Sequence, residues 1–141
     1  MENASGHTEL IKLKIPSQGV YIRKIRKCIQ EICLRNGFSQ KQSQELQLVM
    51  NEAIANIIQH AYNEQKDKPI FVYFIVYPEK IEILIADSGE KPQPEKLKHR
   101  DLNKISEHGL GLLFMEKLVD HMAFDFSEDD KTQLKLTKFK D

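Results

Sequence analysis

The sequence has no long apolar run, no net charge and only two cysteines. A membrane span needs about 18 consecutive apolar residues, and no such run occurs, so we expect no membrane partner. Basic and acidic side chains number 21 each, and the resulting zero net charge argues against nucleic acid as the main partner. Residues 1–9 are polar and lack the apolar core of a signal peptide. These absences predict a cytoplasmic protein.

The two cysteines are not expected to form a site. Cys28 and Cys33 lie five residues apart in a predicted helix and therefore point to different faces. Neither a disulfide nor a metal pair is expected from that spacing. With 141 residues the chain is long enough for a substantial core, so we predict one domain over residues 1–141.

Alternating and helical patterns of apolar residues predict five strands and three helices. Ser39 followed by Gln42 matches a capping box, which marks the start of the second helix. Because the strands cluster as hairpins, the pattern predicts an α+β two-layer sandwich with a mostly antiparallel mixed sheet and the helices on one face. The predicted strands are 10–15, 70–77, 81–86, 122–126 and 134–136, and the predicted helices are 18–36, 39–62 and one beginning near residue 110.

Residues 90–108 differ from the rest of the chain. This segment holds two prolines and many charged side chains but few large aliphatic ones. A polar segment of this length inside a compact domain is usually functional or disordered.

Three polar side chains recur every four residues along the second predicted helix. Glu52, Asn56 and His60 supply a carboxylate, an amide and an imidazole a turn apart, beside an apolar face. Such a stripe can hold a metal ion and activate a hydroxyl. Each residue alone also fits an ordinary helix surface, although Asn56 lies near the core boundary, where an unpaired amide is costly.

Two glycine motifs follow downstream. Asp87-Ser88-Gly89 ends a predicted buried strand, where the carboxylate can accept a hydrogen bond from an exocyclic amine and the glycine admits a flat ring. Gly109-Leu110-Gly111 opens a predicted helix, whose free N–H groups favour an anion. A simple strand-ending turn and a flexible hinge are the alternative interpretations.

The order of these motifs resembles the ATP-binding fold shared by gyrase, heat-shock chaperones and histidine kinases. More narrowly, Asn51-Glu52-Ala53-Ile54-Ala55-Asn56 with His60-Ala61-Tyr62 resembles the anti-sigma-factor serine kinases of bacterial partner-switching systems. The resemblance extends from the first predicted strand to the last, and it implies the histidine-kinase-like ATPase (Bergerat) fold.

The resemblance implies a role for each matching residue. Asn56 would coordinate Mg²⁺ that bridges the phosphates of ATP, and Glu52 would be the general base. Asp87 would bind the adenine amine, and Gly89 would give the ring room.

The remaining implied roles concern the phosphates and the rim of the site. Gly109, Leu110 and Gly111 would present N–H groups to phosphate oxygens, and residues 90–108 would form a lid. Thr132 would line the adenine pocket, and His60 belongs to the expected nucleotide-binding set.

The sequence departs from the family pattern at three places. Lys91 replaces a second glycine, Glu107-His108 stands where an arginine often precedes the lid glycines, and Lys131 replaces the glycine of a Gly-Thr pair. Loss of the arginine removes a bidentate phosphate donor. His108 or Lys104 can substitute for it in part.

Three functions remain open at this point. The first is an ATP-dependent regulatory serine/threonine kinase that phosphorylates a small antagonist protein and alternately holds a sigma factor or similar target. The second is a nucleotide- or partner-binding module without kinase activity. The third is a separate catalytic domain for histidine phosphorylation in trans. The first strand and neighbouring helix offer a candidate face for a homodimer.

Overall fold

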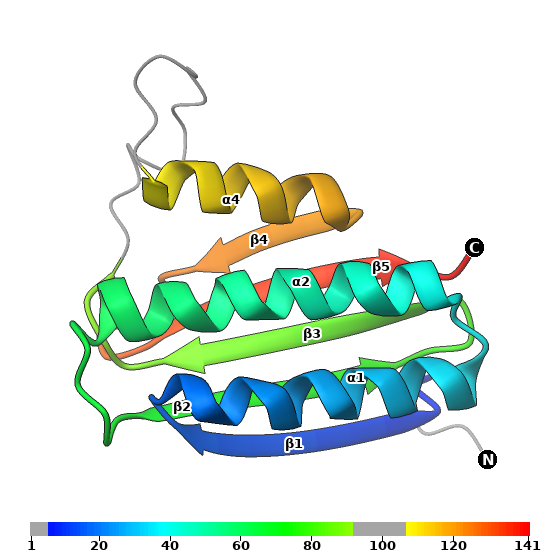
Figure 1. Ribbon diagram of the computed structural model, residues 1–141, viewed down its shortest axis with the longest axis horizontal. Helices are drawn as coiled ribbons and strands as arrows, with labels where there is room; N and C mark the ends of the chain where they lie inside the picture. The colour runs from blue at the N-terminus through cyan, green and yellow to red at the C-terminus, as the bar shows by residue number, and fades with distance from the viewer. Residues whose placement is uncertain (1–5, 92–106) are drawn as a thin grey trace.

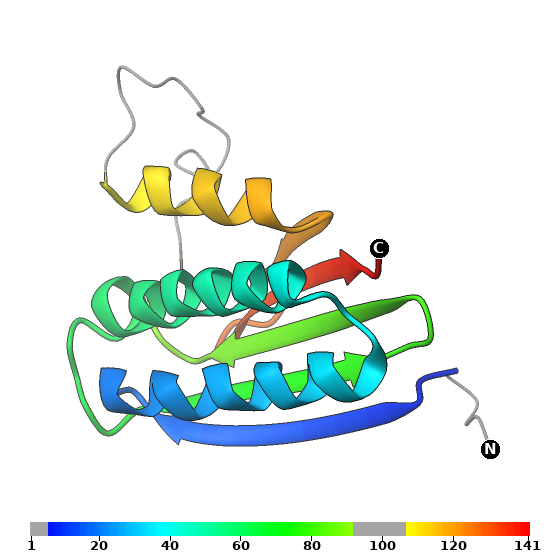
Figure 2. The ribbon, with the colours of Figure 1, turned by 45° about the vertical axis from the view of Figure 1, so that its right-hand side comes forward.

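The computed structural model describes residues 6–91 and 107–141. Within them, three α-helices lie on one face of a five-stranded sheet, as Figures 1 and 2 show, and this confirms the predicted α+β sandwich. A 3₁₀ turn, η1, and a π-helix, η2, complete the described elements. In chain order these are β1 (Glu9–Pro16), η1 (Gly19–Tyr21), α1 (Ile22–Asn36), α2 (Gln40–Asn56), η2 (Ile57–Ala61), β2 (Pro69–Val76), β3 (Lys80–Asp87), α4 (Glu107–Leu118), β4 (His121–Asp125) and β5 (Thr132–Phe139).

The sheet has the strand order β1-β2-β3-β5-β4, and all four pairings are antiparallel. β3 therefore lies in the middle, between β2 and β5. The register places Asp87, the last residue of β3, opposite Thr132, the first residue of β5. Two residues from the predicted site thus meet at one end of the sheet.

The core fills the space between the two layers. The apolar stripes of α1 and α2 pack onto alternate residues of β2 and β3, which fits strands with one face covered. Fully buried members from the helices include Ile25, Ile29, Ile32, Leu46, Val49, Met50 and Ile54, and those from β2 and β3 include Ile70, Val72, Phe74, Val76, Ile81, Ile83 and Ile85.

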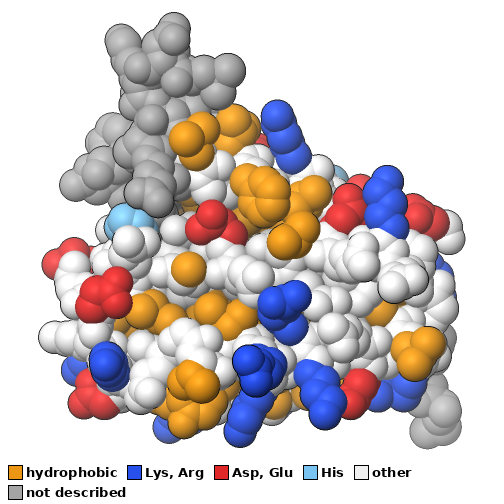
Figure 3. All heavy atoms as spheres, viewed as in Figure 1, with side chains coloured by type: hydrophobic (Ala, Val, Ile, Leu, Met, Phe, Trp, Pro, Cys, Tyr) orange, Lys and Arg blue, Asp and Glu red, His pale blue; other side chains and the backbone are white. Residues whose placement is uncertain are grey.

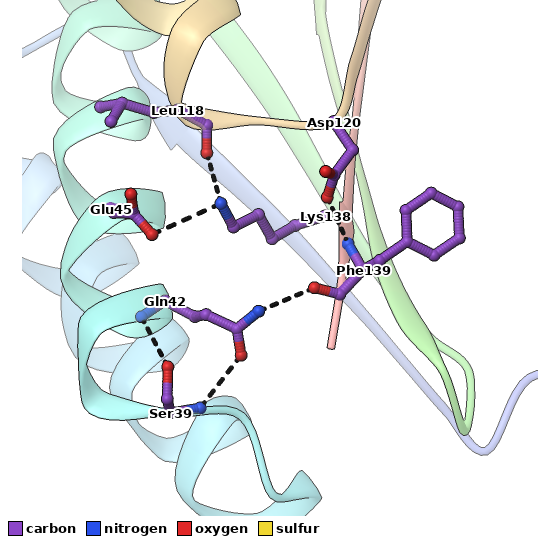
Figure 4. A network of polar contacts seen from close by, with 7 residues as sticks. All are labelled: Ser39, Gln42, Glu45, Leu118, Asp120, Lys138 and Phe139. Atoms are coloured by element: carbon purple, nitrogen blue, oxygen red, sulfur yellow. Dashed lines mark hydrogen bonds and ion pairs between the residues drawn. The ribbon is translucent and has the colours of Figure 1, made fainter. Parts of the chain in front are cut away.

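Polar contacts fix the start of α2 and the end of α4 against β5 (Figure 4). The Ser39 hydroxyl accepts the Gln42 N–H at 3.1 Å and the Gln42 side chain accepts the Ser39 N–H at 3.1 Å, which confirms the predicted capping box. The Gln42 amide also donates to the Phe139 carbonyl at 2.7 Å. Lys138 Nζ donates to the Leu118 carbonyl at 2.7 Å and lies 3.4 Å from Glu45 Oε1.

The helices differ from the prediction at their ends. The second helix continues to residue 61, but it is α-helical only to Asn56 and becomes the π-helix η2 over Ile57–Ala61. α1 begins at Ile22, after the short 3₁₀ turn, and α4 begins at Glu107, before its glycines. The predicted lid, residues 90–108, lies almost wholly outside the described residues.

The exposed face of the helical layer is partly apolar. Figure 3 shows hydrophobic side chains at the surface over α4, where Leu110 and Phe114 are exposed. Both cysteines are free thiols, with Cys33 buried and Cys28 half-buried. Among the described residues, no helix combines the length and the apolar character needed to cross a membrane.

Candidate functional site

A cavity of about 280 Å³ lies at the end of the sheet where β3 stops and β5 begins. Both layers contribute to its wall, so the cavity depends on their packing. Its lining combines eight apolar side chains with seven polar or charged ones, so it offers both an apolar wall and polar contacts. The lining residues are Ala53, Asn56, Ile57, His60, Ala61, Asn63, Ile85, Asp87, Glu90, Lys91, Leu112, Met115, Phe124, Thr132 and Leu134.

Asp87 is a buried carboxylate in this wall, with only 6% of its surface exposed. Its Oδ1 accepts the Gly89 N–H at 2.9 Å, which closes the turn after β3. Burial raises the pKa of Asp87 above its ordinary value, and the hydrogen bond from Gly89 opposes that rise. A carboxylate with spare acceptor capacity in an apolar wall suits a ligand that donates hydrogen bonds.

Two other polar side chains in the wall carry buried atoms without a partner. These atoms are Asn56 Nδ2 and Thr132 Oγ1, and the described part of the chain contains one further case, Asn51 Oδ1, outside the lining. Unpaired buried polar atoms are costly. The pair in the cavity therefore indicates a site for a polar ligand, and it fits a nucleotide, which carries both donors and acceptors.

Glu52 lies beside the cavity lining and in contact with α4. A Cβ built on Gly111 would lie 2.7 Å from Glu52 Cδ and 2.8 Å from its Oε1. Only a glycine therefore lets α4 approach this carboxylate so closely. Gly111 itself is buried.

The structure brings together four of the predicted nucleotide-binding residues. Asn56, His60, Asp87 and Thr132 all line the cavity. Glu52 and Gly111 contact each other at α4, and Gly89 packs against Ala61.

The predicted phosphate-binding residues Gly109 and Gly111 lie in different turns of α4. Because the helix begins at Glu107, Gly109 lies in its first turn, where N–H groups have no partner within the helix. Gly111 lies in the second turn, and its lack of a side chain also leaves space for Glu52. Leu110 keeps half of its surface exposed.

Sequence reasoning did not identify Lys91 and Phe124 as parts of the site. Lys91 Nζ donates to the Phe126 carbonyl at 3.0 Å and also to the Glu128 carbonyl, so it joins the end of the turn after β3 to the β4–β5 turn. In the sequence, Lys91 stands out only as a departure from the family motif. Nothing in the alternation of β4 distinguishes Phe124 as a pocket residue.

Comparisons with known proteins identify the family of this chain. The model of the histidine kinase-like ATPase domain family matches residues 15–138. The serine-protein kinase RsbW of Oceanobacillus iheyensis is 33% identical over 125 residues, which cover 83% of this chain and 79% of the relative. RsbW of Bacillus subtilis (strain 168) is 30% identical, with 82% and 78% covered, and RsbW of Bacillus cereus (strain ATCC 10987) is 32% identical, with 93% and 85% covered.

A solved structure supports the fold. The crystal structure of the RsbU and RsbW domains of Rv1364c from Mycobacterium tuberculosis matches with a TM-score of 0.68 at 15% identity. The match covers 95% of this chain and 33% of that one, so this chain spans about a third of its length. The chain belongs to the histidine kinase-like ATPase family and, within it, to the anti-sigma-factor serine kinases.

Proposed function

We propose that the cavity binds ATP and that the chain phosphorylates a serine or threonine of a small antagonist protein. The observation that carries the proposal is the facing pair at the end of β3 and β5. There, a buried Asp87 carboxylate lies opposite Thr132, whose hydroxyl has no partner within the described residues. Both residues line one cavity with Asn56.

The adenine-binding end of the proposed site is formed by Asp87 and its neighbours. The carboxylate accepts a hydrogen bond from the adenine amine, and Thr132 supplies a second polar contact. Ile85, Met115 and Leu134 provide apolar wall for the ring. Gly89 is required at the turn, because a Cβ there would lie 2.3 Å from the Ala61 carbonyl oxygen.

The phosphate end is assigned to α2, η2 and the start of α4. Within the described residues, no group of three or more His, Cys, Asp or Glu could hold a metal ion. Mg²⁺ would therefore be held by the Asn56 amide oxygen together with phosphate oxygens, as is common for this ion. Rotation of the amide presents either its oxygen or its nitrogen to the cavity. His60 and the N–H groups of Gly109, Leu110 and Gly111 complete the proposed phosphate contacts.

Glu52 is the proposed general base. It takes the proton from the substrate hydroxyl as that oxygen attacks the terminal phosphorus, and the bond to the leaving diphosphate oxygen breaks. Bound Mg²⁺ would supply positive charge to the phosphates. Glu52 lies close to Gly111 at the junction of α2 and α4, next to the cavity rather than inside it.

The proposed partners follow from family membership. A small antagonist protein is the phosphoryl acceptor, and a sigma factor is the alternative partner in the switch. Phosphorylation of the antagonist biases which complex forms. We place this activity in the cytoplasm and keep a homodimer through β1 and α1 as part of the proposal.

A second candidate function is binding without phosphoryl transfer. At two positions that depart from the family motif, the side chain makes a structural contact in this chain. Lys91 holds carbonyls of the β4–β5 turn, and Lys131 pairs with Glu128 at 3.7 Å. Transfer to a histidine is distinguished from both by an acid-labile phosphate on the partner.

Thermal unfolding with ATP or ADP, with and without Mg²⁺, tests nucleotide binding first. Saturation at a hundred times the dissociation constant stabilises the fold by about 2.7 kcal/mol, which corresponds to several degrees in the midpoint. The shift should disappear in Asp87→Ala. If neither nucleotide shifts the midpoint, the proposed ATP site is wrong.

Phosphoryl transfer needs a separate test. Candidate antagonist proteins are incubated singly with this chain, Mg²⁺ and labelled ATP, and an acid-stable phosphate on serine or threonine is expected. Glu52→Gln should abolish the label while keeping the ATP-induced thermal shift. Labelling by Glu52→Gln at the parent rate would remove Glu52 from the role of base.

A further inference from the structure

Tyr62 follows the π-helix η2 and connects three segments through its hydroxyl. The hydroxyl donates to the Pro69 carbonyl at 2.6 Å, at the start of β2. It also accepts the Ser88 N–H at 2.8 Å, in the turn after β3. The residue is buried, and burial raises the pKa of the Tyr62 hydroxyl, which keeps it protonated for both bonds.

The neighbouring residue Ala61 makes a second contact with the same turn. Its carbonyl accepts the Glu90 N–H at 2.8 Å. It also lies against Gly89, where a Cβ would come within 2.3 Å of the carbonyl oxygen. The turn after β3 is therefore docked on the end of η2 through backbone as well as side chain.

Three successive N–H groups of this turn each have a named partner. Ser88 donates to Tyr62, Gly89 donates to the Asp87 carboxylate, and Glu90 donates to Ala61. The bond that orients the Asp87 carboxylate therefore lies between two bonds supplied by residues 61 and 62. A change at either flank moves the Gly89 N–H and, with it, the carboxylate.

The π-helix brings these two partners to the turn. Tyr62 N–H bonds to the Ile57 carbonyl five residues earlier, at 2.8 Å, instead of four as in an α-helix. The wider turn presents Ala61 and Tyr62 to residues 88–90. Asn56 immediately precedes η2. The π-helix therefore links the proposed metal ligand to the turn that follows Asp87.

We propose that Tyr62 is a positioning residue that sets the orientation of the Asp87 carboxylate and thereby the selectivity for adenine over other purines. This inference rests on the proposed binding of adenine at Asp87. Tyr62 contacts the turn and would not contact the adenine, since Tyr62 is absent from the cavity lining.

The test compares dissociation constants for ATP and inosine triphosphate in purified protein. Inosine triphosphate carries a carbonyl oxygen where adenine has its amine, so a correctly placed carboxylate should disfavour it. Tyr62→Phe removes one oxygen atom and should reduce the preference for ATP by about fivefold. A general loss of stability would weaken both nucleotides together and leave their ratio unchanged.

Tyr77→Phe is the matched control. The Tyr77 hydroxyl bonds to Glu82 Oε1 at 3.3 Å, at the β2–β3 hairpin at the other end of β3. The same deletion there should leave the ATP preference at the parent value. A parent-like ratio in Tyr62→Phe, with a reduced ratio in Asp87→Asn, would overturn the role of Tyr62.

The outcome for Asp87→Asn separates the two proposals. If Asp87→Asn keeps the parent ratio, adenine does not bind at Asp87, and the proposed function fails at that point. Should Tyr62→Phe not fold, Ser88→Pro removes the N–H group that the Tyr62 hydroxyl accepts. It should lower the ratio in the same way, and an unchanged ratio would again overturn the inference.

Discussion

Gly111 and Glu52 touch across the junction of α4 and α2, with no room for a side chain between them. A Cβ on Gly111 would lie 2.7 Å from Glu52 Cδ, which is the far end of a flexible side chain. Gly111→Ala should therefore push the carboxylate aside at little cost in stability, because alanine also favours the helix by about 0.5–1 kcal/mol. Displacement of a base by about 1 Å can slow transfer about 100-fold, which a single-turnover assay measures.

The matched control is Gly19→Ala, because a Cβ on Gly19 would meet nothing within 4 Å. This variant should transfer at the parent rate. An equal loss in both variants would show that Gly111→Ala acts through something other than displacement of Glu52.

Asp87→Asn should remove the destabilisation that ionisation of the buried Asp87 causes in the nucleotide-free protein, which depends on pH. Because burial raises the pKa of Asp87 above 3.8, the folded state binds this proton more tightly than the unfolded chain. The contribution of Asp87 to stability therefore falls as pH rises through the window between 3.8 and the folded pKa. At pH 7 the Asn variant should be as stable as the parent or more so, and this advantage should shrink as pH falls through that window.

Urea unfolding of both proteins from about pH 4 to about pH 8 measures the difference. A variant that is less stable than the parent at neutral pH, with a deficit that grows as pH rises, would mean that the fold stabilises the ionised Asp87.

Lys91→Met should loosen the β4–β5 turn. The ammonium group donates to the carbonyls of Phe126 and Glu128, and its loss leaves both without this donor. Amide exchange over residues 126–131 should accelerate by about fivefold or more, because loss of each hydrogen bond is expected to contribute about 1 kcal/mol. The exposed Lys41, on the first turn of α2, provides the matched Lys→Met control, which should leave these amides unchanged. Parent-like exchange in Lys91→Met would show that Lys91 does not stabilise the β4–β5 turn.

Lys138→Met should destabilise the fold by about 2 kcal/mol, because a largely buried ammonium group bonds a helix-end carbonyl and lies near a carboxylate. The carbonyl belongs to Leu118 and the carboxylate to Glu45. On the same strand, Lys135 pairs with Glu82 but keeps 49% of its side chain exposed, so Lys135→Met should cost under about 1 kcal/mol. Denaturant titration compares the two, and equal costs would count against the network in Figure 4.

The sequence predicted elements well where the signal is local. The capping box at Ser39 and Gln42 needs only residues three apart, and the strand alternation needs only neighbours. Thr132 was placed near the proposed adenine site by family resemblance, and the register puts it opposite Asp87. That register depends on pairing β3 with a strand about 45 residues later, which local pattern does not encode.

Two features were not predictable from local pattern. The apolar spacing through Ile57 and Ala61 continues a helical period, yet the backbone there is a π-helix. Its end is fixed by the turn at residues 88–90, which is distant in sequence. The sequence also does not reveal that the missing side chain of Gly111 leaves space for Glu52, in addition to the phosphate contact proposed for its N–H group. Such a use of glycine appears only when the facing element is known.

The cavity wall is shared between the helical layer, through Asn56, and the sheet, through Asp87. Any opening that parts the two layers must therefore also dismantle the cavity. Bound nucleotide should consequently protect peptide bonds throughout the chain from proteases, including bonds in α1, which lies outside the lining. The survival time of the chain in a protease would then report the local supply of nucleotide, even with no phosphoryl acceptor present.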